Sequence, residues 1–229
     1  MKKYKCNVCG QIFESESMPE VCPICGAGRD AIEEVADSIN FSRDTIEKFV
    51  IIGGGIAGLE CAKAIRKRNN TAQITMICGE GIIPYNRPML SKLLASGLPF
   101  DALAVETYDY YQKHNINLIC DALASKIQTK EKIVELTDGR KLAYDKLCIA
   151  TGANANNPIG NTDGSIPVKV LRTLRDALEL ESIGNGSKIF IVGGGILGIE
   201  AAAGLKKMGA DVKVLERGDR IIKQQADEE

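Results

Sequence analysis

The hydrophobic pattern of this chain contains one arrangement twice: a short apolar run, a glycine-rich turn, a helix-compatible stretch and a second apolar run. In the first copy, residues 49–52 predict a buried strand, residues 58–68 a helix and residues 74–78 another strand. The second copy repeats that order over residues 188–192, 197–208 and 211–215. Because strands that alternate with helices form parallel sheets, the pattern predicts an α/β fold of the doubly wound type.

Both turns have the spacing G-x-G-x-x-G, which is typical of a dinucleotide-binding loop. The first glycine permits a tight turn, the second lets a pyrophosphate approach the backbone, and the third lets helix and strand pack closely. A diphosphate would bind at the helix N-terminus, where unpaired N–H groups and the helix dipole favour an anion. Two such loops predict two dinucleotide sites on Rossmann-like units. The glycines are Gly53, Gly55 and Gly58 in the first loop, and Gly193, Gly195 and Gly198 in the second.

An acidic residue follows each loop at the distance expected for a ribose ligand, about 20 residues after the last glycine. Glu80 has this place in the first copy and Glu216 in the second, each just after a predicted strand. A carboxylate accepts hydrogen bonds from ribose hydroxyls and disfavours the 2′-phosphate of NADPH. The second site is therefore expected to bind NADH, although Arg217 beside Glu216 leaves NADPH as an alternative.

Between the two copies the pattern predicts shorter elements. Residues 107–114 predict a short aromatic helix, and residues 171–183 predict a helix that carries Arg172. Asp138 and Gly139 are a strong signal for a hairpin turn. We therefore expect a β-meander inserted into the doubly wound sheet. Its strands are predicted over residues 116–120, 123–128, 132–137 and 142–150.

The N-terminal segment carries a different chemistry, because four of the eight cysteines are clustered there. They form two matched C-x-x-C-G turns, Cys6 with Cys9 and Cys22 with Cys25. Two facing turns of this kind predict a tetrahedral four-thiolate site suited to iron or zinc. A segment this short cannot bury a sufficient core, so a bound metal would supply much of its folding energy. A purely structural zinc ribbon is the alternative.

Composition excludes several classes of partner. The formal net charge is −1, which gives no basic field for nucleic acid or an anionic membrane surface. No apolar run reaches the roughly 20 residues of a membrane span. The N-terminus has two lysines but no apolar stretch behind them, as a signal peptide would have. We therefore expect a soluble cytoplasmic protein.

The cysteine-rich segment resembles a rubredoxin, in the short-loop form found at the end of rubrerythrins. The residues that carry this resemblance are Tyr4 and Lys5 before the first turn, Pro19, and Pro23 within the second turn. The resemblance implies that Cys6, Cys9, Cys22 and Cys25 bind one redox-active iron. Residues 1–36 are accordingly expected to form a metal domain. The polar segment that begins at Asp30 is expected to be a partly helical tether, with a linker over residues 37–47.

A second resemblance rests on the run P-Y-N-R-P-M-L-S-K over residues 84–92. It is similar to a hallmark of the FAD- and NAD(P)H-dependent reductases that serve rubredoxins, ferredoxins and nitrite reduction. The resemblance implies that Arg87 and Lys92 contact FAD, with the lysine near the isoalloxazine ring. A surface loop with two solvated cations is the competing interpretation. The resemblance also implies that Ala150, Thr151 and Gly152 lie near the FAD pyrophosphate.

The same resemblance assigns the two glycine loops. Residues 48–155 are expected to be the first part of an FAD-binding domain, and residues 156–229 an incomplete N-terminal part of an NAD-binding domain. Glu200 matches a position near the nicotinamide, although an acid at a helix N-terminus is also explained by the helix dipole. Family members continue beyond this point, so the chain is expected to be a fragment. The C-x(4)-C pair of disulfide-reductase relatives is absent, so we expect the other cysteines to be buried apolar residues rather than redox partners: Cys61, Cys78, Cys120 and Cys148.

The function implied is an electron-transfer flavoprotein. NADH would reduce FAD, and FAD would reduce a rubredoxin-type iron centre in the same chain and then a downstream electron-acceptor protein. No side chain is expected to act as nucleophile or general base, because the cofactors carry the chemistry. The alternatives are a flavoprotein of the nitrite-reductase type and a flavin reductase that carries a structural zinc ribbon.

Overall fold

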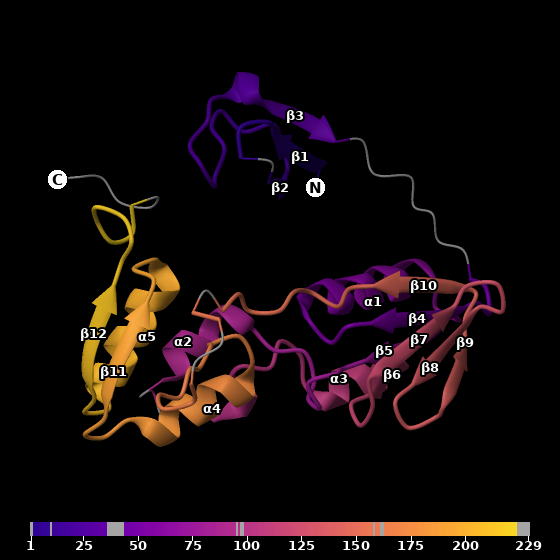
Figure 1. The fold of residues 1–229 in the computed structure, drawn as a ribbon. Helices are drawn as coiled ribbons and strands as arrows, with labels where there is room; N and C mark the ends of the chain where they lie inside the picture. The colour runs from indigo at the N-terminus through magenta and orange to yellow at the C-terminus, as the bar shows by residue number, and fades with distance from the viewer. Residues whose placement is uncertain are drawn as a thin grey trace. The chain divides into compact units, whose positions relative to one another are not determined.

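The computed structural model describes residues 2–9, 11–35, 44–94, 96, 99–157, 159–160 and 163–223 (Figure 1). The chain divides into two compact units. The N-terminal unit comprises Met1–Thr45 with Lys67–Asn70, and the large unit comprises Ile46–Arg66 with Thr71–Glu229. Most of the predicted linker, residues 37–43, lies outside the described residues.

The N-terminal unit is built on a three-stranded antiparallel sheet of order β2-β1-β3. Its strands are β1 (Lys2–Cys6), β2 (Ile12–Ser15) and β3 (Ile32–Val35), and a 3₁₀ turn at Arg29–Ala31 precedes β3. The expectation of a tether from Asp30 is therefore wrong for residues 32–35, which pair with β1. The acidic side chains of Glu33 and Glu34 concealed this strand, because they are exposed while Ile32 is buried.

The large unit contains a four-stranded parallel sheet of order β10-β4-β5-β6. Its elements are β4 (Lys48–Ile52), α1 (Ile56–Arg68), β5 (Gln73–Ile77), β6 (Ile116–Ile119) and β10 (Lys146–Ile149). The predicted strand–helix–strand unit is thus confirmed, with α1 beginning two residues earlier than expected. We call β4, α1 and β5 the first loop unit.

The predicted meander forms a sheet of its own, with antiparallel strands β7 (Ala124–Gln128), β8 (Ile133–Leu136) and β9 (Lys141–Ala143). The expectation of one strand over 142–150 is wrong, because the chain changes sheets at Tyr144 and Asp145. The N–H of Tyr144 donates to Lys132 O (2.9 Å), whereas that of Asp145 donates to Lys48 O (2.8 Å). After this change of partner the chain continues as β10 of the parallel sheet.

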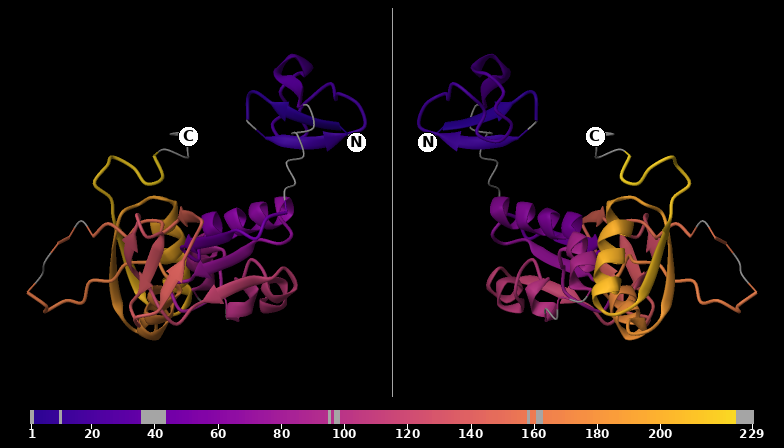
Figure 2. Two further views of the ribbon diagram at one scale, coloured as in Figure 1. Left: turned by 90° about the vertical axis from the view of Figure 1, so that its right-hand side faces the viewer. Right: turned by 90° about the vertical axis from the view of Figure 1, so that its left-hand side faces the viewer.

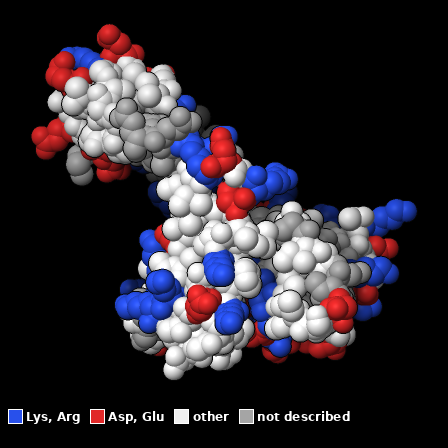
Figure 3. Space-filling model, turned by 60° about the vertical axis from the view of Figure 1, so that its left-hand side comes forward, with Lys and Arg blue, Asp and Glu red and all other residues white. Residues whose placement is uncertain are grey.

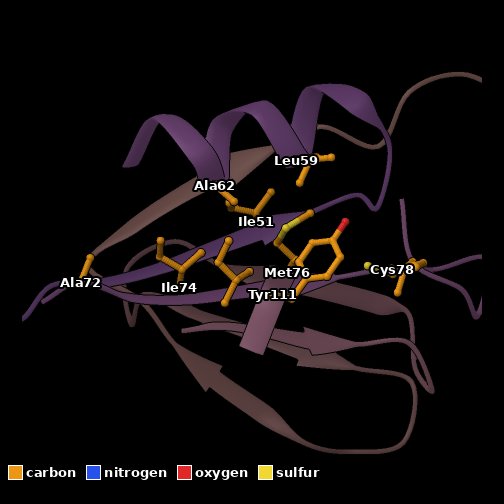
Figure 4. Packing of buried hydrophobic residues seen from close by; sticks show 10 residues of the cluster. Ile51, Leu59, Ala62, Ala72, Ile74, Met76, Cys78 and Tyr111 are labelled. Carbon is orange, nitrogen blue, oxygen red and sulfur yellow. The ribbon is translucent and has the colours of Figure 1, made fainter. Parts of the chain in front are cut away.

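Two hydrophobic clusters hold these layers together. On one face of the parallel sheet, α1 covers alternate residues of β4 and β5 such as Ile51 and Met76 (Figure 4), and α3 (Tyr108–Lys113) adds Tyr111 to the same cluster. Cys78, just after β5, also belongs to it. On the other face, Ile52 and Ile77 pack with the meander. Each strand therefore places successive side chains in different clusters, as the alternation of a strand requires.

Short helices connect the parallel sheet to the C-terminal part. A 3₁₀ helix (Arg87–Met89) leads into α2 (Leu90–Leu93), another 3₁₀ helix spans Phe100–Ala102, and α4 (Leu174–Ile183) follows the loop after β10. Helix α4 begins three residues later than predicted, so Arg172 precedes it. Thr173 caps the N-terminus of α4, so the helix begins after it. In this capping box the Thr173 hydroxyl accepts from Asp176 N, and the Asp176 carboxylate accepts from Thr173 N.

The second loop unit consists of β11 (Lys188–Val192), α5 (Ile196–Lys207) and β12 (Asp211–Leu215). The strands are parallel and form a two-stranded sheet, as the pattern predicted. Helix α5 lies along this sheet (Figure 2), with Ala201 and Leu205 packed against Ile189, Ile191 and Val212. Within the described residues, no helix is both long and apolar enough to cross a membrane.

Candidate cofactor and metal sites

The first glycine loop joins β4 to α1 in a conformation that needs glycine. Gly53 has φ +128°, and a Cβ there would lie 2.1 Å from Ala150 O. A Cβ on Gly58 would lie 2.1 Å from Gly53 O, which explains the close packing of helix on strand. A Cβ on Gly55 would have no other atom within 4 Å, so the backbone there is open to a ligand. Gly53 and Gly58 therefore have the structural roles predicted from their spacing, and Gly55 leaves the space that its predicted role requires.

The segment Ala150–Gly152, predicted to lie near the FAD pyrophosphate, packs against this loop. The N–H of Ala150 donates to Ile52 O (2.8 Å), which places Ala150 and Thr151 against Gly53. Gly152 follows with φ +72°, so the chain turns away directly after this contact. Residues about 100 positions apart in sequence thus meet at the carboxyl end of β4, where ligands of doubly wound sheets bind.

Glu80 and Arg87, predicted from separate motifs, are direct partners. The Arg87 guanidinium forms an ion pair with the Glu80 carboxylate and also donates to Arg172 O (2.5 Å). Tyr85 lies between them: its hydroxyl donates to Glu80 (2.6 Å), and its ring centroid is 5.0 Å from the Arg87 guanidinium. Burial and the hydrogen bond to Glu80 raise the pKa of Tyr85. A ribose hydroxyl that binds Glu80 would therefore compete with Arg87 and Tyr85.

Tyr85 and Ser91 contact predicted site residues, Glu80 and Glu200, but the sequence reasoning did not single them out, although both lie within the P-Y-x-R-P-x-L-S-K run. Ser91 on α2 is 2% exposed, and its hydroxyl donates to Glu200 of α5 (2.5 Å). Glu200, expected near a nicotinamide, thus links the second loop unit to α2. Lys92 is the next residue after Ser91, and its side chain is exposed.

A cavity of about 340 Å³ opens at the carboxyl ends of β5 and β6. Glu80 lies on its wall together with Cys120 and Asp121. Its position beside the predicted ribose acid suits the adenosine end of a dinucleotide. The other lining residues are Gly79, Gly81, Ala122, Leu123 and Thr137.

The second glycine loop repeats the backbone geometry of the first. Gly193 has φ +116°, and a Cβ on Gly198 would lie 2.0 Å from Gly193 O. The space around a Cβ on Gly195 would again be empty to 4 Å. The Glu216 carboxylate accepts from Gly218 N (2.8 Å) and Gly194 N (2.6 Å), and these hydrogen bonds lower the pKa of Glu216. The predicted ribose acid is therefore held against its own loop as an anion.

The four N-terminal cysteines converge as predicted. All four sulfurs lie within 4.8 Å of one another, with 3.7 Å between Cys6 and Cys25 and 3.9 Å between Cys9 and Cys22. Sulfurs about 2.3 Å from a tetrahedral metal are separated by about 3.8 Å, so the site fits a single ion. Hydrogen bonds from the backbone of Cys9 and Val8 lower the pKa of Cys6 to about 7, which favours the thiolate that a metal needs. Gly26, with φ +74°, allows the second turn to close.

The charge distribution on the face shown in Figure 3 does not indicate a binding surface for nucleic acid or another highly charged macromolecule. Figure 3 shows lysine and arginine side chains interspersed with acidic ones on one face, without a large area of one sign among the described residues. This agrees with the formal net charge of −1.

Two glycine loops, each with an acid after its second strand, and a cluster of four cysteine sulfurs define a dinucleotide-dependent oxidoreductase with a metal-binding module. The chain belongs to the pyridine nucleotide-disulphide oxidoreductase family, whose family model matches residues 47–229. The rubrerythrin, rubredoxin-like domain matches residues 4–33. The predicted α/β fold and both resemblances are confirmed.

Individual relatives agree with this placement. The NADH-rubredoxin oxidoreductase of Clostridium acetobutylicum is 36% identical over 169 residues, which are 73% of this chain and 43% of that protein. The ferredoxin--NAD(+) reductase component of the p-cumate 2,3-dioxygenase system of Pseudomonas putida is 33% identical over 81% of this chain and 46% of its own length. This chain therefore spans less than half the length of these relatives.

Solved structures show the same coverage. The crystal structure of the C. acetobutylicum NADH:rubredoxin oxidoreductase matches with a TM-score of 0.65 and 33% identity, over 74% of this chain and 44% of that one. The covalent putidaredoxin reductase–putidaredoxin complex matches with a TM-score of 0.70 and 30% identity, over 79% of this chain and 45% of that one. The family implies FAD and a pyridine nucleotide as cofactors. The open glycine loops fit such groups, and the cysteine cluster fits a metal.

Proposed function

We propose that this chain carries electrons from NADH through FAD to an iron ion bound by Cys6, Cys9, Cys22 and Cys25. The observation that carries the proposal is the presence, in one chain, of a four-thiolate site of tetrahedral dimensions and a reductase fold with two dinucleotide loops. The name of the C. acetobutylicum relative, an NADH-rubredoxin oxidoreductase, joins the same two components.

The residues of the first loop unit would bind and orient FAD, which supplies the conversion between two-electron and one-electron transfer. The N–H groups at the start of α1 would hold the pyrophosphate, with Gly55 leaving room for it. Glu80 would accept a ribose hydroxyl in place of Tyr85 or Arg87. By the family resemblance, Arg87 and Lys92 would then contact the flavin, where their positive charge favours the reduced, anionic form.

The second loop unit supports NADH rather than NADPH. Glu216 directly follows β12, and its carboxylate accepts hydrogen bonds from two backbone N–H groups. The carboxylate cannot move away from an incoming 2′-phosphate without breaking these hydrogen bonds. Arg217 beside it offers only partial compensation. Glu200 would lie near the nicotinamide if the hydrogen bond from Ser91 persists in the complex.

The N-terminal unit supports electron transfer rather than a structural metal. Cys25 is exposed, so the centre reaches the protein surface. Each cysteine turn also presents an exposed apolar residue, Val8 (69%) and Ile24 (56%), where a purely structural ribbon has no need of one. Apolar residues around an accessible metal ligand suit brief contacts with a redox partner, and the onward acceptor is proposed to be another electron-transfer protein.

The test is single-turnover reduction of the full chain loaded with FAD and iron, in the absence of oxygen. NADH should bleach the flavin absorbance first and the iron–thiolate absorbance second, and NADPH should do so much more slowly. A matched sample with Cys9→Ser should still bleach the flavin. Iron that stays oxidised beside reduced flavin would refute the internal route, and stoichiometric zinc in protein from an iron-supplemented host would favour the structural ribbon.

A further inference from the structure

Two of the scattered cysteines lie side by side on neighbouring strands. Strands β5 and β6 are parallel, and the last pair in their register is Ile77 with Ile119. Cys78 and Cys120 are the next residue on each strand, and the N–H of Cys78 continues the ladder by donating to Ile119 O (2.7 Å). Neighbouring strands are about 4.8 Å apart. This separation falls within the range of about 4.4–6.8 Å between Cα atoms that a disulfide spans.

Both thiols point to the same face of the sheet. Cys78 and Cys120 belong to the cluster under α1 and α3, whereas Ile77 and Ile119 belong to the cluster on the opposite face. Side chains of directly adjacent residues on one face are the closest neighbours that a sheet provides. The register and the common face thus place the two side chains next to each other, as a disulfide requires.

The surroundings of the two cysteines differ. Cys78 is 1% exposed and packs under the first glycine loop, since a Cβ on Gly54 would lie 2.8 Å from its sulfur. Cys120 is only partly buried and lines the cavity that also contains Glu80. Cys120 is therefore the more accessible residue of the pair, and Cys78 is the buried one.

A buried hydroxyl lies in the same cluster. Tyr111 of α3 is 2% exposed, and among the described residues its hydroxyl has no hydrogen-bond partner (Figure 4). Burial raises the pKa of Tyr111, and the neighbouring Cys78 and Cys120 contribute further to the increase. The thiol–thiol interaction raises the pKa of Cys78 and lowers that of Cys120. An accessible cysteine that favours the thiolate beside a buried partner is the arrangement of a redox-sensitive dithiol.

We propose that Cys78 and Cys120 are a peroxide-sensitive dithiol that closes to a disulfide beneath the first dinucleotide loop. The Cys120 thiolate attacks one oxygen of hydrogen peroxide, which leaves a sulfenic acid on Cys120 and releases hydroxide. The Cys78 thiol then attacks that sulfur: the S–S bond forms, the S–O bond breaks and water leaves. The hydroxide takes up the proton that Cys120 released on ionising, so that two thiols lose two electrons in total and one peroxide becomes two water molecules. An external dithiol reverses the reaction by exchange.

The chain contains a matched pair for comparison. Cys61 on α1 and Cys148 on β10 are also neighbours in the same cluster, but neither lines the cavity. Burial and the adjacent Cys148 raise the pKa of Cys61 to about 11, so this thiol stays protonated. Because neither cysteine lines the cavity, the Cys61–Cys148 pair is expected to stay reduced at peroxide concentrations that oxidise Cys78 and Cys120.

The test is peptide mapping of the full chain, with zinc loaded on the N-terminal cysteines to protect them. After a stoichiometric dose of hydrogen peroxide and alkylation, mass spectrometry should find a cross-linked peptide that contains Cys78 and Cys120, and dithiothreitol should remove it. Cys78→Ala should instead trap a sulfenic acid on Cys120, detected with dimedone. Cys148→Ser, the matched control, should leave the cross-link unchanged.

Three results would overturn the proposal. The first is recovery of Cys78 and Cys120 as separately alkylated thiols in the folded wild-type chain. The second is a cross-link between Cys61 and Cys148 that forms at least as fast as the one between Cys78 and Cys120. The third is the absence of dimedone label on Cys120 in Cys78→Ala. Circular dichroism of each variant before oxidation identifies any that fail to fold, and the wild-type measurement decides the question without them.

Discussion

The two loop units share the same glycine motif and have very different surroundings. Their glycine turns share the same close approach, since a Cβ on the third glycine of each would lie 2.1 or 2.0 Å from the carbonyl oxygen of the first. Strand β4 lies between two parallel neighbours, and Ile52 at its end is 7% exposed. Strand β11 has one neighbour among the described strands, and the equivalent Val192 is 52% exposed. The motif thus determines the loop, while the neighbouring strands determine burial.

This difference predicts unequal stability. Phe190 (60%) and Leu215 (52%) add further exposed apolar surface to the second loop unit. Burying a side chain of this size contributes about 2 kcal/mol. The second loop unit therefore lacks several contributions that the first possesses, and it should open at lower denaturant concentration.

The largest expected effect comes from the third glycine of each loop. Gly58→Ala drives a Cβ into Gly53 O, and we expect a loss of more than about 3 kcal/mol from the free energy of unfolding. Gly198→Ala makes the same clash in the second loop unit and serves as the matched variant. Urea unfolding followed by hydrogen exchange should show global loss in Gly58→Ala and loss confined to β11, α5 and β12 in Gly198→Ala. Equal global losses would show that the two units unfold together.

The next effect concerns the strand ends. Ile52→Ala removes a buried side chain, and we expect a cost of about 3 kcal/mol. Val192→Ala changes the equivalent, half-exposed position and should cost less than about 0.5 kcal/mol. Chemical denaturation of both variants measures the difference. A large cost at Val192 would mean that another surface covers β11 in solution.

A smaller effect is expected where α2 meets the second loop unit. Ser91→Ala deletes the hydroxyl that donates to Glu200, and the expected loss is about 1 kcal/mol. A double-mutant cycle with Glu200→Ala isolates the interaction, because the two losses should not add. Additive losses would indicate that the hydrogen bond does not couple α2 to α5.

The smallest effect is a pH dependence of the second loop. The pKa of Glu216 is lowered in the fold, so its contribution is complete above the unfolded value of about 4.3 and is lost as pH falls through the folded value. Solvent screens this exposed carboxylate, which keeps the effect small. Hydrogen exchange at Gly194 should accelerate as the pH falls from about 5 to about 3, beyond the intrinsic pH dependence of exchange. Glu216→Gln should abolish that additional change, and a variant that kept it would assign it to another group.

Local motifs explain how much of this structure could be predicted from the sequence. The glycine spacing predicted both loops, and the C-x-x-C pairs predicted the converging sulfurs, because each depends on a few consecutive residues. The change of sheets at Tyr144 could not be predicted, since it depends on a carbonyl of Lys48 far away in the sequence. The four scattered cysteines were expected to be buried, but only Cys78 is; Cys61, Cys120 and Cys148 are partly buried against the same cluster. Their pairing was not foreseen. That pairing follows from strand register and from the packing of α1 on β10.

The contact between Asp145 and Lys48 has a consequence for synthesis of the chain. The Asp145 carboxylate accepts from Lys48 N (2.7 Å) across a separation of 97 residues, at the point where β10 comes to lie beside β4. During translation, the backbone groups along one edge of β4 therefore remain unpaired until β10 leaves the ribosome much later. Pairing between distant segments is slow, and an open strand edge invites intermolecular association. The nascent chain is therefore most vulnerable to aggregation after β6 has emerged and before β10 has docked.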